Sequence, residues 1–467
     1  MDFLKHLATP QSVGHFHLLL FIAGLLSAVL YPYLGFLLGS SFLSIFFNKR
    51  GMREGNPRFV RFAKDLIDTA LFNKSIPTFL ALLPCFSLVF VYAQLMQSTD
   101  AISVGLVGYG FVLLLIAIVL LYTYKYTFRL SGVLEGYERL LKSGSKPAGE
   151  LGKIEEFSKQ TAESYHKAGR WGIVALAVAA FLLVSSVSVN VNPSDWTEVT
   201  SVFDLLLSFD VLIRILEFLA LAAGATGIGI LYFFFSWPGG KRDLDPEYAS
   251  LVRRIGVRLA VTSLLAQPIL MLTGVLLLPS ESLSGTLYGF TGASLVLLFL
   301  AAHFVYAFVR DSHDRYATSA FYTFLFAFVF LFASDQLAIH DATNEHAASL
   351  AYQYDQDTEA LKTKLGVVVV TFTGEDIYNA RCSACHLFDR KKVGPAYKDV
   401  IPQFEGKKQQ LIAFILNPVK VNPAFPPMPN PGLKPAEADS IASFLLKKFA
   451  TNTPAPADSV KGHPKQP

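Results

Sequence analysis

Residues 104–124 read VGLVGYGFVLLLIAIVLLYTY and contain no charged side chain. A helix needs about 20 such residues to cross the hydrocarbon core of a membrane, because each backbone polar group must be bonded within the helix. Seven further long, largely apolar segments occur, at 15–47, 76–96, 171–189, 209–236, 259–278, 286–309 and 317–334. The sequence therefore predicts an all-α fold built on a bundle of eight transmembrane helices.

The composition of the whole chain agrees with a membrane protein. Of its 467 residues, 52% are hydrophobic and only 16% are charged, whereas a soluble domain carries roughly 25% charged residues. This balance excludes a soluble globular protein, a disordered chain and a coiled coil. Three cysteines are too few for a disulfide scaffold. We expect membrane lipid around the chain and no nucleic-acid partner.

Basic residues alternate strictly between the segments that connect the predicted spans. Twenty-three Lys and Arg residues lie in segments 48–75, 125–170, 237–258 and 310–316. None lies in loops 97–103, 190–208 and 279–285. Because basic loops stay on the cytoplasmic side, we expect a multi-pass protein of the bacterial inner membrane with both termini on the periplasmic side.

The hydropathy pattern divides the chain into four parts. Residues 1–338 form the predicted membrane domain, and 339–370 form a polar, acidic connector that ends in a short apolar patch. A small all-α domain is expected at 371–449. The tail, 450–467, is rich in Pro, Ala and Lys, which predicts disorder.

A motif with specific chemistry stands in the small domain: Cys382-Ser383-Ala384-Cys385-His386. The C-x-x-C-H spacing is the attachment pattern for haem c. Two thiols on one side of a helical turn can add to the haem vinyl groups, and the adjacent imidazole can serve as an axial iron ligand. Because haem attachment takes place outside the cytoplasm, the motif agrees with the side predicted from the loop charges.

The residues around this motif resemble a class I cytochrome c domain. A short helix at 374–380 enters the motif, Gly394-Pro395 follows it, Met428 stands in a Pro-Pro-Met-Pro loop, and an amphipathic helix begins near Pro435. The resemblance implies one covalent haem c bound through Cys382 and Cys385, iron ligation by His386 and Met428, and orientation of His386 by the Pro395 carbonyl. The alternative for Met428 is a buried side chain that fills a gap in the core.

Three polar residues of the membrane domain are candidate site residues, since ionisable groups within a membrane are functional hypotheses by default. His17 stands near the start of the first span, and Arg214 and Glu217 share one face of the fifth. His17 is otherwise an interfacial side chain. Arg214 and Glu217 are either a structural ion pair or, for Glu217, part of a proton relay. No span carries the paired histidines of a two-haem cytochrome b, so a haem b is not expected.

Residues 10–338 also resemble the large subunit of cytochrome bd oxidase. The similarity rests on His17, on segment 185–196, on Arg214-Ile215-Leu216-Glu217 and on segment 253–268. Several features of that family are missing: Glu217 replaces a haem-ligand histidine, span 104–124 lacks two carboxylates, and the quinol-binding loop shrinks to 279–285. The resemblance implies a degenerate copy of that subunit, with a cytochrome c domain attached.

The combined expectation is an electron-transfer subunit of a terminal-oxidase-like complex. Its haem c would accept electrons from a periplasmic cytochrome or similar carrier and pass them to the haems of a bd-oxidase-like large subunit. One alternative is a membrane-anchored cytochrome of another respiratory complex. A second is a catalytic core that holds its own haem b through His17 and Glu217.

Overall fold

The computed structural model of the chain describes residues 9–143, 148–239, 244–311, 313–365 and 372–450. All regular elements among these residues are helical, which confirms the predicted all-α class. The described residues separate into two compact units, one of residues 17–343 and one of residues 344–450 together with 9–16. We call them the membrane unit and the C-terminal unit, and describe each by itself.

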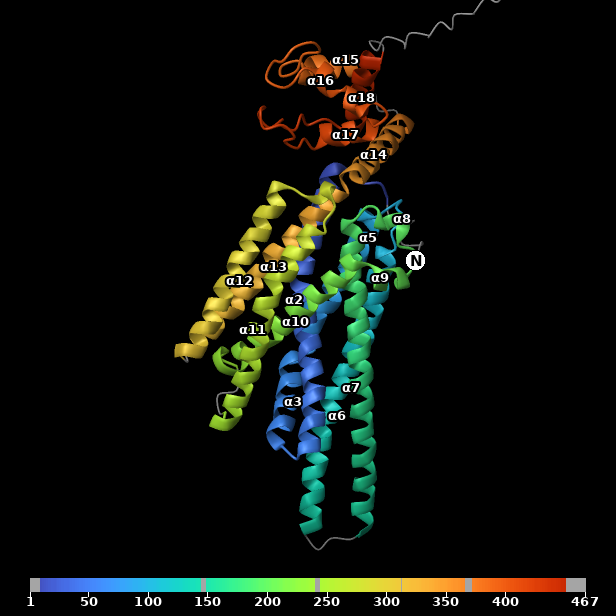
Figure 1. The fold of residues 1–467 in the computed structure, drawn as a ribbon. Helices are drawn as coiled ribbons and strands as arrows, with labels where there is room; N and C mark the ends of the chain where they lie inside the picture. Colours follow the sequence, from blue (N-terminus) through green and yellow to red (C-terminus); the bar gives the residue numbers. More distant parts are fainter. Residues whose placement is uncertain (1–8, 144–147, 240–243, 312, 366–371, 451–467) are drawn as a thin grey trace, which may run out of the picture. The chain divides into compact units, whose positions relative to one another are not determined.

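Among the described residues, eight helices are long and apolar enough to cross a membrane, as predicted. The elements up to residue 342 are α2 (Val13–Glu54), α3 (Pro57–Ala70), α4 (Ser75–Pro77), η1 (Thr78–Leu82), α5 (Leu83–Leu95), α6 (Ser103–Ser143), α7 (Ala148–Val191), α8 (Asp195–Glu198), α9 (Val202–Leu207), α10 (Phe209–Leu231), η2 (Tyr232–Ser236), α11 (Pro246–Leu276), η3 (Ser280–Ser282), α12 (Gly285–Asp311) and α13 (Arg315–Ala342). Helices α6 and α7, α10 and α11, and α12 and α13 pack as pairs (Figure 1).

Helix α10 is the most deeply buried of the eight. Small residues allow its neighbours to approach closely. An added Cβ at Gly227 would lie 2.4 Å from the backbone nitrogen of Ala260 on α11, and one at Gly35 of α2 would lie 3.0 Å from the Cα of Ala222. Such contacts are typical of packed membrane helices. Arg214 and Glu217 lie in the first three turns of this buried helix.

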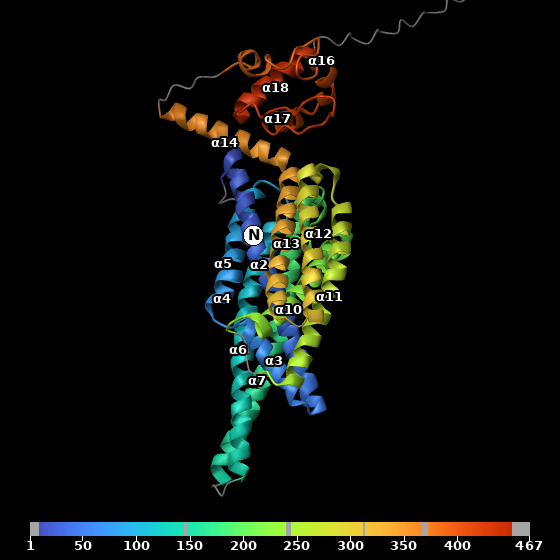
Figure 2. The same ribbon diagram turned by 90° about the vertical axis from the view of Figure 1, so that its left-hand side faces the viewer.

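Helices α6 and α7 extend well beyond their apolar segments. They comprise 41 and 44 residues, so each is roughly 60 Å long at 1.5 Å per residue, about twice the thickness of a hydrocarbon core. Both views show the two helices side by side along this extension (Figures 1 and 2). The polar ends, on the side of the basic segments, therefore form a two-helix hairpin.

The C-terminal unit consists of short helices around one apolar cluster. Its elements are α14 (Asn344–Lys364), α15 (Gly374–Ile377), η4 (Tyr378–Cys382), α16 (Tyr397–Val400), η5 (Pro402–Phe404), α17 (Lys408–Leu416) and α18 (Pro435–Ala450). The cluster takes side chains from α15, α17 and α18, among them Ile377, Leu411 and Ile441, each at most 4% exposed.

The predicted connector, 339–370, is helical over most of its length. It contains the end of α13 and the whole of α14, and α14 packs against α17 and α18. Ala348 joins the apolar cluster, and the Asp355 carboxylate accepts a hydrogen bond from the Ala436 N–H, 3.4 Å away, at the start of α18. The predicted apolar patch Val367–Val370 and the predicted disordered tail beyond residue 450 lie outside the described residues.

Candidate haem centre and buried membrane residues

A capped helix leads into the C-x-x-C-H motif. The Thr373 hydroxyl accepts a hydrogen bond from the Asp376 N–H, and the Asp376 carboxylate accepts bonds from the N–H and hydroxyl of Thr373, a capping box that begins α15. Helix α15 continues into the π-helical turn η4, which ends at Cys382. The buried Tyr378 of this turn donates its hydroxyl to the His386 carbonyl at 3.2 Å. The motif is thereby fixed to the packed core.

The two cysteines stand on one tight turn. The backbone N–H groups of Cys385 and His386 both donate to the Cys382 carbonyl, at 3.1 and 2.9 Å. Both thiols are half-buried and free of disulfide bonds, and Cys382 packs against the apolar cluster. Burial raises the pKa of the Cys382 thiol and also that of the neighbouring Tyr397 hydroxyl, so both groups are neutral at pH 7 in a setting that suits an apolar macrocycle.

The His386 ring is held from two sides. Its Nδ1 lies 3.1 Å from the Pro395 carbonyl oxygen, and its plane stacks on Tyr397 with 4.9 Å between ring centroids and 5° between planes. Because a carbonyl can only accept, Nδ1 carries the proton and Nε2 presents its lone pair, as an iron ligand must. An added Cβ at Gly394 would lie 2.3 Å from Cε1 of this ring. Only glycine leaves room for the imidazole here.

Met428 stands in the loop between α17 and α18. The Asn430 amide donates to the Leu416 carbonyl at 2.8 Å, and its oxygen accepts from the Gly432 N–H at the same distance. Gly432 has φ +64°, a conformation that favours glycine. Three prolines beside Met428 stiffen the loop further, and the Met428 side chain is half-buried.

This donor set fits a covalently bound haem. Two thiols on one turn, an imidazole with an oriented lone pair and a thioether on a stiff loop lie in one small unit with an apolar core. A haem bound in this way supplies a one-electron redox centre. Attachment through Cys382 and Cys385 and ligation by His386 and Met428 stay predictions, but the orientation of the imidazole is a property of the protein itself.

The membrane unit brings two of the predicted residues together with a third that the sequence did not single out. Nη1 of Arg214 lies 2.5 Å from Oδ1 of Asp335 on α13 and 3.6 Å from Oε2 of Glu217. The spacing of Arg214 and Glu217 on one helix face predicts that these two side chains lie together. Asp335 directly follows the eighth predicted span, 317–334, and is not among the predicted site residues. One sequence signal could have identified Asp335: the helical pattern of the eighth span continues past this residue, and α13 ends only at Ala342.

His17 lies apart from this group. Its Nε2 is 3.3 Å from Nε2 of His340 on α13, and Nδ1 of His340 is 2.9 Å from the carboxylate of Asp341. His17 is exposed and His340 is half-buried. A role of His17, Arg214 or Glu217 in binding a cofactor stays a prediction.

Comparisons with known proteins match the C-terminal unit. The family described as "Cytochrome C oxidase, cbb3-type, subunit III" matches residues 371–445. Cytochrome c-551 of Pseudomonas denitrificans is 37% identical over 79 residues, which are 16% of this chain and 95% of that protein. Cytochrome c-552 of Hydrogenobacter thermophilus is 32% identical over 87 residues, 18% of this chain and 88% of that protein.

These relatives are covered almost completely, and the matched family begins and ends within the unit that carries the motif. The cofactor is therefore haem c and the chemistry is electron transfer. Through its C-terminal domain, which follows eight helices able to cross a membrane, this chain belongs to the cytochrome c family.

Proposed function

We propose that the chain is the electron-entry subunit of a bd-like oxygen reductase of the bacterial inner membrane. Its haem c accepts electrons from a periplasmic carrier and delivers them to haems in a partner large subunit. The observation that carries this proposal is the union, in one chain, of a c-type haem centre with a membrane unit whose loop between α11 and α12 is short. The single predicted haem c then serves as a relay.

The loop between α11 and α12 supports an electron entrance other than quinol. Residues 279–285 form little more than the turn η3, and Ser282 is fully buried with its hydroxyl bonded to the Val191 carbonyl at 3.2 Å. A packed loop of this length cannot enclose a quinol headgroup. The resemblance of residues 10–338 to the bd large subunit supports the choice of partner.

The first test is the haem content of the full-length chain purified alone, measured as a pyridine haemochrome spectrum. One haem c per chain and no haem b is the expected result. Haem b in the purified chain would contradict the relay and favour the alternative in which His17 and Glu217 hold a cofactor. A His17→Ala variant that lost the b-type band would then identify the ligand.

The second test uses membranes that contain the complete complex. Oxygen uptake driven by reduced soluble cytochrome c should disappear in a Cys382→Ala/Cys385→Ala variant, and a subunit with haem b or d should co-purify with both forms. The matched control is Ser383→Ala, which changes the same turn and leaves both thiols. Co-purification with a subunit that carries no haem b or d would overturn the proposed partner.

A cytochrome subunit of another respiratory complex is the second candidate function. It is favoured by the matched family, whose description names a subunit of a cbb3-type cytochrome c oxidase. In that case the co-purified redox partner differs, while the haem content of this chain is the same. The identity of the co-purified haem subunit therefore separates the two candidates.

A further inference from the structure

One arginine in the membrane unit, Arg214, lies close to two buried carboxyl groups. Glu217 is 6% exposed and Asp335 is 8% exposed, and both approach the same nitrogen, Nη1 of Arg214. A guanidinium carries one positive charge and stays protonated in proteins. If both carboxyl groups were ionised, the group would bury one uncompensated negative charge, which is costly in a low-dielectric interior.

The two carboxyl groups are not equivalent. Asp335 accepts a hydrogen bond from Arg214 at 2.5 Å. Glu217 Oε2 lies 3.6 Å from the same nitrogen, beyond hydrogen-bond distance, and Oε1 of Glu217 is buried without a hydrogen-bond partner. A buried carboxylate needs both a counter-charge and hydrogen bonds. Asp335 has both, so the neutral, protonated member of the pair is Glu217.

Among the described residues, Arg214 is the only Lys, Arg or His that lines the two cavities beside Glu217. The pocket of Glu217 is lined by Tyr31 of α2, Val184 and Val187 of α7, Phe218 and Leu221 of α10, and Leu331 and Phe332 of α13, besides Arg214 and Asp335. On α11, an added Cβ at Gly274 would lie 3.8 Å from Oε2. Other titratable groups that interact electrostatically with Tyr31, Arg214 or Asp335 include Tyr92 and Cys85 of α5 and Asp210 of α10. Each of these is neutral or negative.

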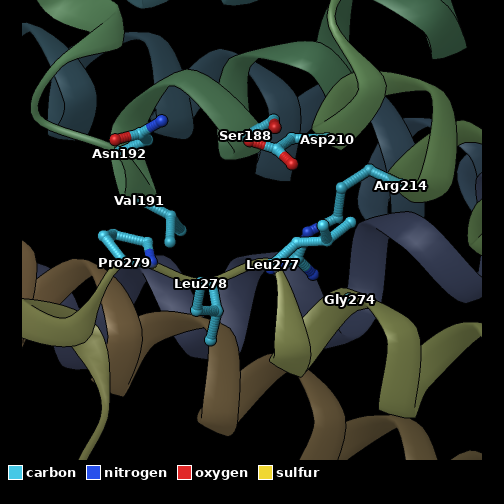
Figure 3. Close-up of a pocket in the computed structure, with 9 residues that line it drawn as sticks. All are labelled: Ser188, Val191, Asn192, Asp210, Arg214, Gly274, Leu277, Leu278 and Pro279. Atoms are coloured by element: carbon cyan, nitrogen blue, oxygen red, sulfur yellow. The ribbon is translucent and has the colours of Figure 1, made fainter.

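A second pocket shares Arg214 with the first and is also lined by the loop residues Asn192 and Pro279. Ser188 and Asp210 line it too. Figure 3 shows the side chains of Ser188, Asp210 and Arg214 around this pocket. Asp210 is partly exposed. Polar groups thus continue from the loop surface to the buried carboxyl groups.

We propose that Glu217 is a proton-binding site, neutralised by a proton while Asp335 and Arg214 form the ion pair, and that this proton exchanges with the aqueous phase through the pocket of Ser188, Asn192 and Asp210. The site is independent of the identity of the electron-transfer partner. Its ligand is the proton alone. The step is an exchange of that proton with water, with no change in redox state.

Infrared absorption of the full-length, haem-loaded chain in lipid tests the proposal. At pH 8, a protonated-carboxyl C=O band that shifts in D₂O is expected, and Glu217→Gln removes it. Asp335→Asn also removes it, because Glu217 must then ionise to pair with Arg214. Asp195→Asn is the matched control: burial and the nearby carboxylates Asp210 and Glu198 raise the pKa of Asp195 to about 6, so this group is ionised at pH 8 and the band stays.

Wild-type protein without the band at pH 8 overturns the proposal, whatever the variants do. A band that persists in Glu217→Gln places the proton elsewhere and overturns it equally. The exchange route has its own readout, since Asp210→Asn should slow the D₂O shift of the band several-fold. An unchanged exchange rate contradicts the route. Haem absorbance and a single size-exclusion peak establish that each variant is folded.

Discussion

Gly394 is the residue on which the geometry of the haem centre depends most directly. Its missing side chain is the space that the His386 ring fills. Gly394→Ala should displace the imidazole from the Pro395 carbonyl, lower the haem content per chain and cost roughly 1–3 kcal/mol of stability, the usual range for overpacking. Haemochrome spectra and thermal unfolding measure both effects.

The matched control for this substitution is Gly105→Ala. An added Cβ at Gly105 meets nothing within 4 Å, so haem content should equal that of the wild type. If Gly394→Ala bound haem normally and unfolded at the wild-type temperature, the close approach of residue 394 to the ring would have no bearing on the site.

The capping box at Thr373 predicts an acid sensitivity of the C-terminal unit. The Thr373 hydroxyl and N–H bond to the exposed Asp376 carboxylate and lower its pKa. A folded-state pKa below the unfolded value of about 3.9 stabilises the fold above that pH. This contribution is lost as the pH falls through the folded-state pKa. Asp376→Asn should therefore lose stability at pH 7 and have a flatter pH profile toward acid.

Denaturant unfolding of the haem-loaded chain, followed by haem absorbance between pH 7 and pH 3, measures this profile. Asp389→Asn, which also removes an exposed carboxylate of the same unit, is the control and should follow the wild-type curve. Identical profiles for Asp376→Asn and Asp389→Asn would show that the cap makes no pH-dependent contribution.

Sequence and structure agree at the residue level where one local pattern carries the chemistry. The C-x-x-C-H motif and the Gly394-Pro395 pair each occupy only a few consecutive residues, so both can be recognised in the sequence. In the structure, Nδ1 of His386 lies within hydrogen-bond distance of the Pro395 carbonyl oxygen. The pairing of Asp335 with Arg214 is not predicted, because the two residues are 121 positions apart and lie on different helices. Tertiary pairing of this kind leaves no local signal.

Helix α14 is the element whose structure the polarity of the sequence leaves open. Its acidic sequence with few apolar residues is typical of a connector, and the structure shows it as a 21-residue helix with Ala348, Leu350 and Ala351 buried. Alanines contribute little to a hydropathy profile, although they allow close packing. The eight membrane-spanning helices can be predicted from the sequence more directly. A long apolar segment within a membrane must bond its own backbone polar groups, and a helix does this.

Breaking the contact of α14 with the C-terminal core should release this helix. Ala348→Asp places a carboxyl group in the apolar cluster at a cost of roughly 2 kcal/mol or more, so hydrogen exchange along α14 should quicken. The control is Gln353→Asp, which adds the same charge to an exposed position of the same helix. Equal exchange in the two variants would mean that α14 does not depend on the cluster.

At the scale of the whole molecule, the loop charges predict which side of the membrane each end of the bundle faces. Helix α3, the far ends of α6 and α7, the end of α12 and the start of α13 lie toward one end of the membrane unit (Figures 1 and 2). These elements carry or adjoin the basic segments, and we expect this end in the cytoplasm.

Alkaline phosphatase fusions, which are active only in the periplasm, test this orientation. Fusions after Thr99 and Ser284 should be active, and one after Asn73 should be inactive. The reverse pattern would place the haem centre in the cytoplasm, where it could not meet a periplasmic donor. The electron-entry proposal would then be lost.

The hairpin of α6 and α7 also has a consequence for imaging the protein. A helical bundle embedded in a detergent micelle offers few features by which single particles can be aligned. This hairpin projects about 30 Å past the hydrocarbon region, since each helix is roughly twice as long as the membrane requires. It forms a rod outside the micelle that marks the orientation of each particle in projection.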